Sequence, residues 1–168
     1  PNANSRTLCT GKRPPSTDNR RPTTDNEPRP PATDMPPVSP EVERYLAALY
    51  DDGDPIRREM ETRAAAERFP IVGPLVGRHL QHLALSIGAR RIFELGSGFG
   101  YSALFFARAV GPTGEVHCSD SDEANRTLAA DYLGRAGLWT RVRFHVGDAL
   151  GALRTVGGLW DVIYNDID

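Results

Sequence analysis

Three glycines at alternate positions, Gly96, Gly98 and Gly100, are the feature that most constrains the fold of this chain. They follow a short apolar segment, residues 91–95, and precede an almost wholly apolar segment, residues 101–109. A short apolar strand that ends in a glycine turn and continues into a helix is typical of one unit of a parallel sheet. Glycine adopts positive φ angles easily and lets the backbone approach a ligand closely, because it has no Cβ. We therefore expect a strand, a tight turn and a buried helix here.

The rest of the chain repeats this alternation of strand and helix. Short apolar or alternating segments predict further strands at residues 115–120, 142–146 and 162–164. Residues 122–133 and 149–153 lie between them and predict helices. Parallel neighbours need a crossover connection, so strands separated by helices indicate an α/β fold with an open parallel sheet.

Three further helices are predicted before the first strand, within residues 39–88. The pairs Ser39-Pro40 and Asp54-Pro55 each combine a capping residue with a proline at the first helical position. The third helix is expected to start at Gly73-Pro74 and to end at Gly88. Its apolar residues share one face: Val76, Leu80, Leu83 and Ile87.

The first 38 residues have a different composition. Ten of the fourteen prolines lie in residues 1–40, where apolar residues are few. Such a segment cannot bury enough surface to offset the entropy lost on ordering, so residues 1–38 are predicted to be a disordered tail. The first methionine is Met35, and we hypothesise that translation naturally starts there.

Charge and composition exclude several classes of protein. The formal net charge is −2, so the chain lacks the basic balance typical of nucleic-acid binders. No apolar run approaches the roughly 20 residues of a membrane-spanning helix, and the first residues lack the apolar centre of a secretory signal. Two cysteines, Cys9 and Cys118, are too few for a disulfide framework. We expect a cytoplasmic protein without nucleic-acid or membrane partners.

Candidate binding residues follow three of the predicted strands. Ligands of open α/β sheets bind at the carboxyl ends of the strands, where the glycine turn lies. Asp120 ends the second strand, and a carboxylate there can accept hydrogen bonds from both hydroxyls of a ribose. Asp148, in Gly147-Asp148-Ala149 after the third strand, could meet the amino group of an adenine. Asp148 alone also fits a common turn, but the three features together favour a nucleoside site.

The glycine turn argues against a nicotinamide cofactor. A dinucleotide fingerprint has its last glycine at the position that Tyr101 occupies here. The departure favours a nucleoside ligand without a pyrophosphate at the helix start.

The motifs resemble those of a known family at several separate places. The run Phe93-Glu94-Leu95-Gly96-Ser97-Gly98-Phe99-Gly100-Tyr101-Ser102-Ala103 resembles motif I of S-adenosylmethionine-dependent O-methyltransferases of the catechol and caffeoyl-CoA type. Upstream, Phe69-Pro70-Ile71-Val72-Gly73 resembles the segment that closes over the methionine part of the cofactor. Downstream, residues 161–168 resemble the family's Asp-x-x-x-x-Asp-x-Asp-Lys stretch.

The resemblance implies a role for each matching residue. The residues expected around the methionine and ribose parts of S-adenosylmethionine are Gly96, Ser97, Gly98, Tyr101 and Ser102, with Glu94 near the amino end. Asp120 would hold the ribose, Asp148 and Ala149 would border the adenine, and Val72 and Gly73 would contact the methionine carboxylate. Asp166 would be a ligand of a divalent metal, usually Mg²⁺.

The resemblance also implies a class I methyltransferase fold of Rossmann-like type. Its sheet has seven strands, of which residues 89–168 would supply the first four, in the order 3-2-1-4, with the last three missing. The family's catalytic lysine would lie beyond Asp168, and the one lysine of this chain is Lys12 in the tail. We therefore expect a C-terminally truncated enzyme that is inactive alone and has an exposed fourth strand. The complete protein, for which a homodimer is a candidate assembly, would methylate a hydroxyl of a small molecule.

Two alternatives stay open from the residues. The chain could be a non-catalytic nucleoside-binding or interaction module, or a metal-independent methyltransferase that acts on another atom. The histidines His117 and His145 are interpreted as residues at the edge of the core, and Cys118 as a small buried side chain.

Overall fold

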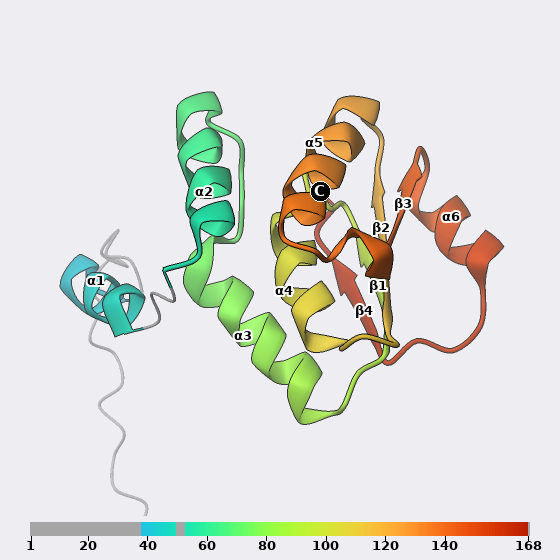
Figure 1. Cartoon of the computed structure of the whole chain (residues 1–168), viewed down its shortest axis with the longest axis horizontal. Coiled ribbons are helices and arrows are strands. Elements are labelled where there is room, and N and C mark those ends of the chain that lie inside the picture. Colours follow the sequence, from blue (N-terminus) through green and yellow to red (C-terminus); the bar gives the residue numbers. More distant parts are fainter. Residues whose placement is uncertain (1–37, 50–52, 168) are drawn as a thin grey trace, which may run out of the picture. The chain divides into compact units, whose positions relative to one another are not determined.

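The computed structural model describes residues 38–49 and 53–167 (Figure 1). The chain divides into two units at residue 37, and the first unit lies outside the described residues. The predicted disordered tail and the hypothesis about Met35 therefore lie outside them too, except for the exposed Val38.

Four parallel strands form one sheet in the second unit. They are β1 (Arg91–Leu95), β2 (Glu115–Asp120), β3 (Val142–Val146) and β4 (Val162–Asn165), in the order β3-β2-β1-β4. Phe93 of β1 lies opposite His117 of β2 and Ile163 of β4. The predicted parallel sheet and strand order are confirmed. β1 and β2 are almost wholly buried because helices cover both faces, whereas Ile163 on the edge strand β4 is 53% exposed.

Helices precede the sheet and connect its strands (Figure 1). Before β1 lie α1 (Pro40–Leu49), α2 (Pro55–Glu67) and α3 (Gly73–Ser86). The connections contain α4 (Tyr101–Ala109), α5 (Glu123–Arg135), a short 3₁₀ helix (Trp139–Arg141) and α6 (Ala149–Val156). In Figure 1, α4 and α5 lie on one side of the sheet and α6 on the other. None of the helices in the described ranges is long and apolar enough to cross a membrane.

Aspartates start three of these helices. Asp54, Asp122 and Asp148 accept hydrogen bonds from the backbone N–H groups of Ile56 (2.9 Å), Ala124 (2.8 Å) and Gly151 (2.7 Å), respectively. Each bond satisfies a first-turn donor that has no partner within its helix. Local sequence rules therefore locate the starts of α2, α5 and α6.

The helix α4 is the centre of the core, as its apolar sequence predicts. Leu104 and Phe105 are 0% exposed, and Arg108 is the one residue of α4 that is not buried. α3 packs on α4 through Gly77, where an added Cβ would lie 2.3 Å from Cε2 of Phe105. α4 is thus held between α3 and the sheet.

The apolar face predicted for α3 is mostly exposed in the structure. Val76, Leu83 and Ile87 are 45%, 48% and 61% exposed, and the buried residues of α3 are Gly77 and Ala84. Small side chains make this contact because they let the helix backbone approach the bulky residues of α4 closely. Leu80, the fourth residue of the predicted face, does pack against the core. The prediction from large apolar residues was therefore wrong for Val76, Leu83 and Ile87.

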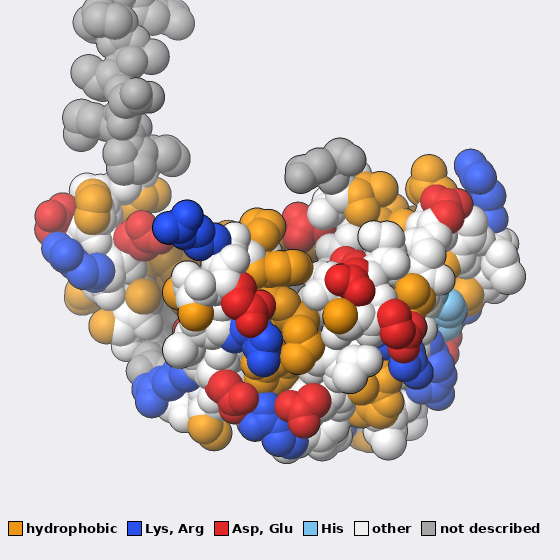
Figure 2. All heavy atoms as spheres, turned by 90° about the horizontal axis from the view of Figure 1, so that it is seen from above, with side chains coloured by type: hydrophobic (Ala, Val, Ile, Leu, Met, Phe, Trp, Pro, Cys, Tyr) orange, Lys and Arg blue, Asp and Glu red, His pale blue; other side chains and the backbone are white. Residues whose placement is uncertain are grey.

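Charged side chains of both signs are interspersed on the described part of the face seen from above (Figure 2). Apolar side chains gather between them in the middle of this face.

Candidate functional site

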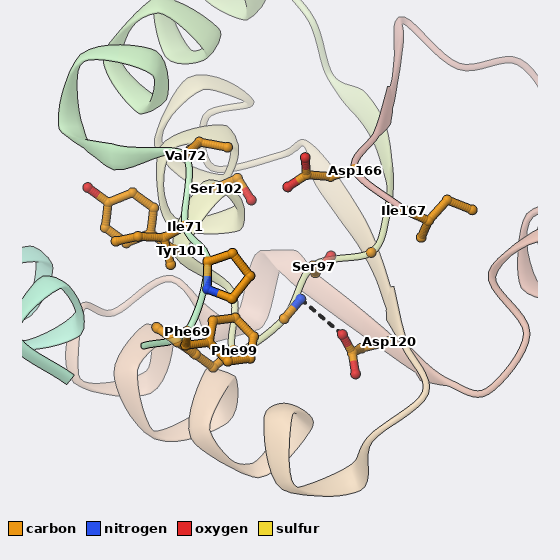
Figure 3. A pocket seen from close by; sticks show the side chains of 13 residues that line it. Phe69, Ile71, Val72, Ser97, Phe99, Tyr101, Ser102, Asp120, Asp166 and Ile167 are labelled. Atoms are coloured by element: carbon orange, nitrogen blue, oxygen red, sulfur yellow. Dashed lines mark hydrogen bonds between the residues drawn. The ribbon is translucent and has the colours of Figure 1, made fainter. Parts of the chain in front are cut away.

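A pocket of about 520 Å³ lies at the carboxyl ends of β1, β2 and β4 (Figure 3). The turn after β1 forms its floor, the end of β2 one side, the residues after β4 another, and the α2–α3 connection a third. The lining residues are Phe69, Pro70, Ile71, Val72, Gly96, Ser97, Gly98, Phe99, Tyr101, Ser102, Asp120, Asp166 and Ile167.

The glycine turn has the backbone that its sequence predicts. Gly96, Gly98 and Gly100 have φ angles of +83°, +49° and +87°. A Cβ on Gly96 would lie 2.7 Å from the carbonyl oxygen of Asp166, and one on Gly98 would lie 2.7 Å from Cε1 of Phe69. Positive φ and close neighbours both require glycine at these two positions. The turn therefore brings the segments on either side of the pocket into contact with its floor.

The carboxylate of Asp120 is held in place at the pocket edge by three donors. Its Oδ2 accepts from the backbone N–H of Gly98 at 3.1 Å (Figure 3). Its Oδ1 accepts from the backbone N–H of Asp122 at 2.8 Å and from Nδ2 of Asn125 at 3.1 Å. A carboxylate offers about four lone-pair sites, so these three bonds leave one acceptor site for a ligand, on Oδ2. The structure thus presents a pre-oriented acceptor where the sequence predicts one.

Glu94 lies behind the pocket wall rather than on it. Its side chain is wholly buried and is not among the lining residues. Ser97 Oγ donates to its Oε2 at 2.8 Å, and Ser102 Oγ donates to its Oε1. Burial raises the pKa of Glu94 to about 7, although the bonds from Ser102 and Ser97 oppose that shift, and the charge of Asp166 adds to it. The two serines, unlike Glu94, line the pocket.

Asp166 closes the pocket opposite Ser102 (Figure 3). Its backbone N–H donates to the carbonyl of Leu95 at 2.8 Å, which extends the pairing of β4 with β1. Tyr164 Oη donates to Asp166 Oδ1 at 3.4 Å. Burial, and then the charge of Asp166, raise the pKa of Tyr164 to about 12.

The donor set for the expected divalent metal is incomplete. Within the described residues, no group of three or more His, Cys, Asp or Glu side chains could hold a metal ion. Magnesium prefers about six oxygen ligands, and Asp166 supplies one carboxylate at this wall. The residues described here do not by themselves fit a metal.

Tyr101 contributes its ring to the pocket and its hydroxyl to α2. Its phenol points away from the cavity (Figure 3) and donates to Glu61 Oε1 at 2.6 Å. Arg57, buried on α2, donates to the same oxygen at 2.7 Å. Burial is the main cause that raises the pKa of Tyr101. These bonds connect the start of α4 to α2, which leads into the α2–α3 connection at the pocket.

Eight of the predicted site residues line the pocket, and four do not. The eight are Val72, Gly96, Ser97, Gly98, Tyr101, Ser102, Asp120 and Asp166. Gly73 begins α3 beside Val72, and Glu94 is buried behind the wall. Asp148 is exposed and caps α6, and Ala149 begins that helix. Their contact with an adenine stays a prediction.

The site residues predicted from the sequence did not include those of the apolar part of the pocket. Phe69 and Phe99 pack with their ring centroids 4.8 Å apart, next to Pro70 and Ile71. The motif that contains Val72 also contains Phe69, so the resemblance carried this signal. Ile167 is the other omitted residue.

The remaining candidate residues lie outside the pocket lining. His117 Nδ1 and His145 Nε2 are 2.9 Å apart, and both rings pack near Phe93. Burial lowers the pKa of both histidines. Cys118 is wholly buried, which raises the pKa of its thiol. These positions agree with the packing roles interpreted from the sequence.

The fold and the pocket together define a Rossmann-like α/β protein with a ligand pocket at the carboxyl ends of its parallel strands. The chain belongs to the O-methyltransferase family, because its residues 56–168 match the model of that family.

Known relatives agree with this membership. The catechol O-methyltransferase of Mycobacterium tuberculosis is 33% identical over 138 residues, which are 80% of this chain and 63% of that protein. An O-methyltransferase from Bacillus cereus, solved in complex with SAH, is 30% identical with a TM-score of 0.70, over 76% of this chain and 61% of that one. The O-methyltransferase TomG from Streptomyces achromogenes, solved in complex with SAM, is 29% identical with a TM-score of 0.70; the match covers 76% of this chain and 60% of that one. The chain thus spans 63% of the length of its mycobacterial relative.

Proposed function

We propose that this chain binds S-adenosylmethionine in the pocket, and that the protein to which it corresponds transfers the methyl group to a hydroxyl of a small molecule. Family membership and the SAH and SAM complexes of two relatives support the proposal. The observation that carries it is Asp120, whose carboxylate three donors hold beside the glycine turn. The acceptor site that remains on Oδ2 suits a hydroxyl of a ribose.

The pocket has the size and charge for this cofactor. Ligand pockets commonly measure about 300–1,000 Å³, and this one measures about 520 Å³. Among the described lining residues the charged ones are Asp120 and Asp166, both acidic, and they favour a ligand with positive charge. With the ribose at Asp120, the methionine end extends along Ser97 toward Ser102 and Val72. The first-turn N–H groups of α4 lie at that end and suit a carboxylate, since they have no acceptor within the helix.

The main contribution of this chain to methyl transfer is to align the reacting groups. The bound cofactor supplies an already activated methyl group. The chain fixes the ribose through Asp120, supports the other end through Ser97 and Ser102, and covers the ligand with Phe69, Pro70 and Ile71. Holding the reacting groups in line converts a bimolecular encounter into a nearly unimolecular step.

The finer expectations stay proposals. Catechol is the substrate named for the mycobacterial relative, and a small hydroxyl compound is the class that we propose here. Metal assistance, a homodimer and a cytoplasmic location are predictions that the described residues leave untested.

Titration calorimetry with SAH tests the proposal. We expect the chain to bind SAH, and Asp120→Ala to weaken binding about 10- to 100-fold, because hydrogen bonds to a charged acceptor contribute roughly 1.5–3 kcal/mol. Asp131→Ala is the matched control, since this exposed aspartate of α5 pairs with Arg135 and does not line the pocket. Absence of SAH binding, or equal affinity of the Asp120→Ala variant, would contradict the proposal.

A further inference from the structure

The histidines His117 and His145 lie outside the pocket, and the proposed function assigns them no role. We propose that they form a pH-sensitive switch: the neutral pair holds Trp160 and the α6–β4 connection, residues 157–161, against the sheet, and uptake of a proton releases them. The connection leads directly into β4, after which Asp166 forms one wall of the pocket. The switch goes beyond the proposed function, because it lets pH act on the site from a distance.

The histidine pair lies on the face of the sheet that α6 covers. Side chains alternate along a strand, and Glu94 of β1 bonds Ser102 of α4, so the neighbouring Phe93 points to the opposite face. His117 is the Cα partner of Phe93 and shares that face, on which Figure 1 shows α6. His145 joins them from β3, with its ring centroid 6.0 Å from that of Phe93.

The two imidazole rings are arranged end to end. His117 Nδ1 and His145 Nε2 are 2.9 Å apart, the ring centroids are 5.2 Å apart, and the ring planes differ by 15°. Two ring radii added to the distance between the nitrogens account for the whole distance between the centroids. The two nitrogens therefore point at each other almost within one plane. This is the geometry of an N–H···N hydrogen bond, which holds one hydrogen between the rings.

Glu115 determines which ring donates that hydrogen. The other ring nitrogen of His117, Nε2, is buried and lies 3.4 Å from Glu115 Oε2. A carboxylate favours a hydrogen on the nitrogen that faces it, so Nδ1 of neutral His117 accepts from the Nε2–H of His145. Nδ1 of His145 then carries no hydrogen, and it is the nitrogen that takes up an added proton.

The surroundings of the pair disfavour an added proton. Burial is the main cause that lowers the pKa of both histidines below the ordinary value of 6.5. The carboxylate of Glu115 opposes this shift for His117, whereas the charges of His145 and Arg91 add to it. The other charged side chains of the surrounding segments on this face are exposed: Arg143, Asp148, Arg154 and Asp161. A charged His145 ring is therefore better solvated outside the sheet face, and turning outward breaks its bond to His117.

Trp160 packs directly on this pair. The centroid of its ring lies 5.1 Å from those of His117 and Phe93, and the guanidinium carbon of Arg91 lies 4.1 Å from it on another side. Arg91 Nε in turn donates to Glu115 at 2.7 Å. A proton that reaches His117 makes it compete with Arg91 for Glu115. The pair thus controls two of the contacts that hold Trp160, the His117 ring and the Arg91 guanidinium.

Release of Trp160 acts on the pocket through β4. The residue after it, Asp161, donates its N–H to the carbonyl of Arg91 at 2.9 Å, and Asp166 donates its N–H to the carbonyl of Leu95 at 2.8 Å. The same pairing of β4 with β1 therefore fixes the connection and the pocket wall. β4 has one neighbour in the described sheet, so few other contacts hold it when the connection is released.

Fluorescence of Trp160 tests the switch without any ligand. Trp139→Phe leaves Trp160 as the only tryptophan, since the sequence contains two. Between about pH 8 and about pH 5.5 we expect its emission maximum to move to longer wavelength and its quenching by acrylamide to rise about twofold, with a midpoint below about 6.5, while far-UV circular dichroism stays constant. Lower intensity without a wavelength shift would mean direct quenching by an imidazolium and would overturn the switch. Loss of circular dichroism over the same pH range would overturn it too.

His145→Gln tests whether the histidine pair causes this response. Glutamine can place an N–H donor near the position of His145 Nε2 but does not titrate in this range. We expect the wavelength shift of Trp160 to shrink to about a third or less, because the first proton has no place to bind. His82→Gln is the matched control, since this exposed histidine of α3 lies away from the pair, and it should leave the shift unchanged. A full response of the His145→Gln variant would overturn the switch.

If His145→Gln does not fold, the imidazole NMR signals of the wild-type chain decide. Two of its four histidines must then titrate with the midpoint of the Trp160 response. Midpoints that differ from that of Trp160 would overturn the switch.

Binding of SAH tests the coupling to the pocket, and this arm rests on the proposed function. Lowering the pH from about 7.5 to about 5.5 should weaken SAH binding about three- to tenfold more in the wild type than in His145→Gln, since one proton shifts an equilibrium at most about tenfold per pH unit. Titration of Glu94 affects both proteins alike. Equal pH dependence in the two proteins would overturn the coupling. If the wild type binds no SAH at either pH, the proposed function fails, and the Trp160 response still decides the switch.

Discussion

Gly77→Ala tests how closely α3 must approach α4. A Cβ at residue 77 would lie 2.3 Å from Cε2 and 2.6 Å from Cδ2 of Phe105. The Phe105 side chain is 0% exposed, and its ring also packs edge-on against Tyr101, with centroids 5.5 Å apart. The ring has little room to yield, so α3 and α4 must separate.

Two opposing terms set the size of the effect. Replacing glycine by alanine inside a helix stabilises it by up to about 1 kcal/mol. Overpacking a well-packed core costs about 1–3 kcal/mol, and contacts this short belong to the upper part of that range. We therefore expect the free energy of unfolding of the Gly77→Ala variant to fall by about 1–2 kcal/mol.

Urea unfolding followed by circular dichroism measures this change, and α5 offers the control. Gly134 is also a helical glycine, but an added Cβ there would meet no atom within 4 Å. Gly134→Ala should therefore raise the free energy of unfolding by up to about 1 kcal/mol. The same glycine-to-alanine substitution is therefore expected to lower the free energy of unfolding in α3 and to raise it in α5.

The result that would refute this reasoning is a Gly77→Ala variant as stable as Gly134→Ala, since it would mean that Phe105 yields freely. The site gives a second readout. α3 starts next to Val72, and α4 contains Ser102, both of which line the pocket. Separating the two helices should therefore also weaken SAH binding.

Two further predictions concern Glu94 and Arg91. The pKa of Glu94 is about 7 in the folded chain, whereas the ordinary value of a glutamate, 4.5, applies to the unfolded chain. Between these two pH values the unfolded chain therefore binds fewer protons than the folded chain. The free energy of unfolding should fall by roughly 3 kcal/mol as the pH rises from below 4.5 to above 7. Glu94→Gln should remove this part of the slope in urea unfolding at several pH values, and an unchanged slope would contradict the assignment. Arg91 Nε donates to Glu115 at 2.7 Å, its NH1 donates to the carbonyls of Gly157 and Leu159, and its guanidinium carbon lies 4.1 Å from the centroid of the Trp160 ring. Arg91→Ala should therefore expose residues 157–161 to faster cleavage by chymotrypsin, whereas Arg126→Ala, which loses an exposed pair with Glu123, should not.

The elements that sequence predicts well are those that local chemistry determines. The strand of residues 91–95, the glycine turn and the apolar helix after it follow from residue type and spacing, and the structure has all three. Asp120 lines the pocket because parallel strands bring their carboxyl ends to one edge. The strand order came from the family resemblance, since local pattern does not determine which strands pair.

The features that local sequence does not reveal depend on contacts between distant segments. The packed face of α3 is set by the fit of Gly77 against Phe105, and no hydrophobic periodicity reveals such a fit. Glu94 resembles a ligand-binding residue in sequence, but its strand position turns its side chain into the core behind two serines. Phe69 joins the pocket because Gly98 leaves space for its ring.

The pairing of β1 with β4 sets an order of events during synthesis on the ribosome. β4 is the last of the four strands to be made, yet Ile92 of β1 pairs with Val162, and Gly96 fits against the backbone of Asp166. A nascent chain that has emerged only through β3 contains the glycine turn and Asp120 but lacks the Asp166 side of the pocket. Its β1 edge is an open strand edge that invites wrong pairing. The proposed ligand would meet an incomplete pocket in this intermediate and would stabilise it less than the folded chain, so the open edge of β1 stays exposed until β4 and residues 166–167 have emerged.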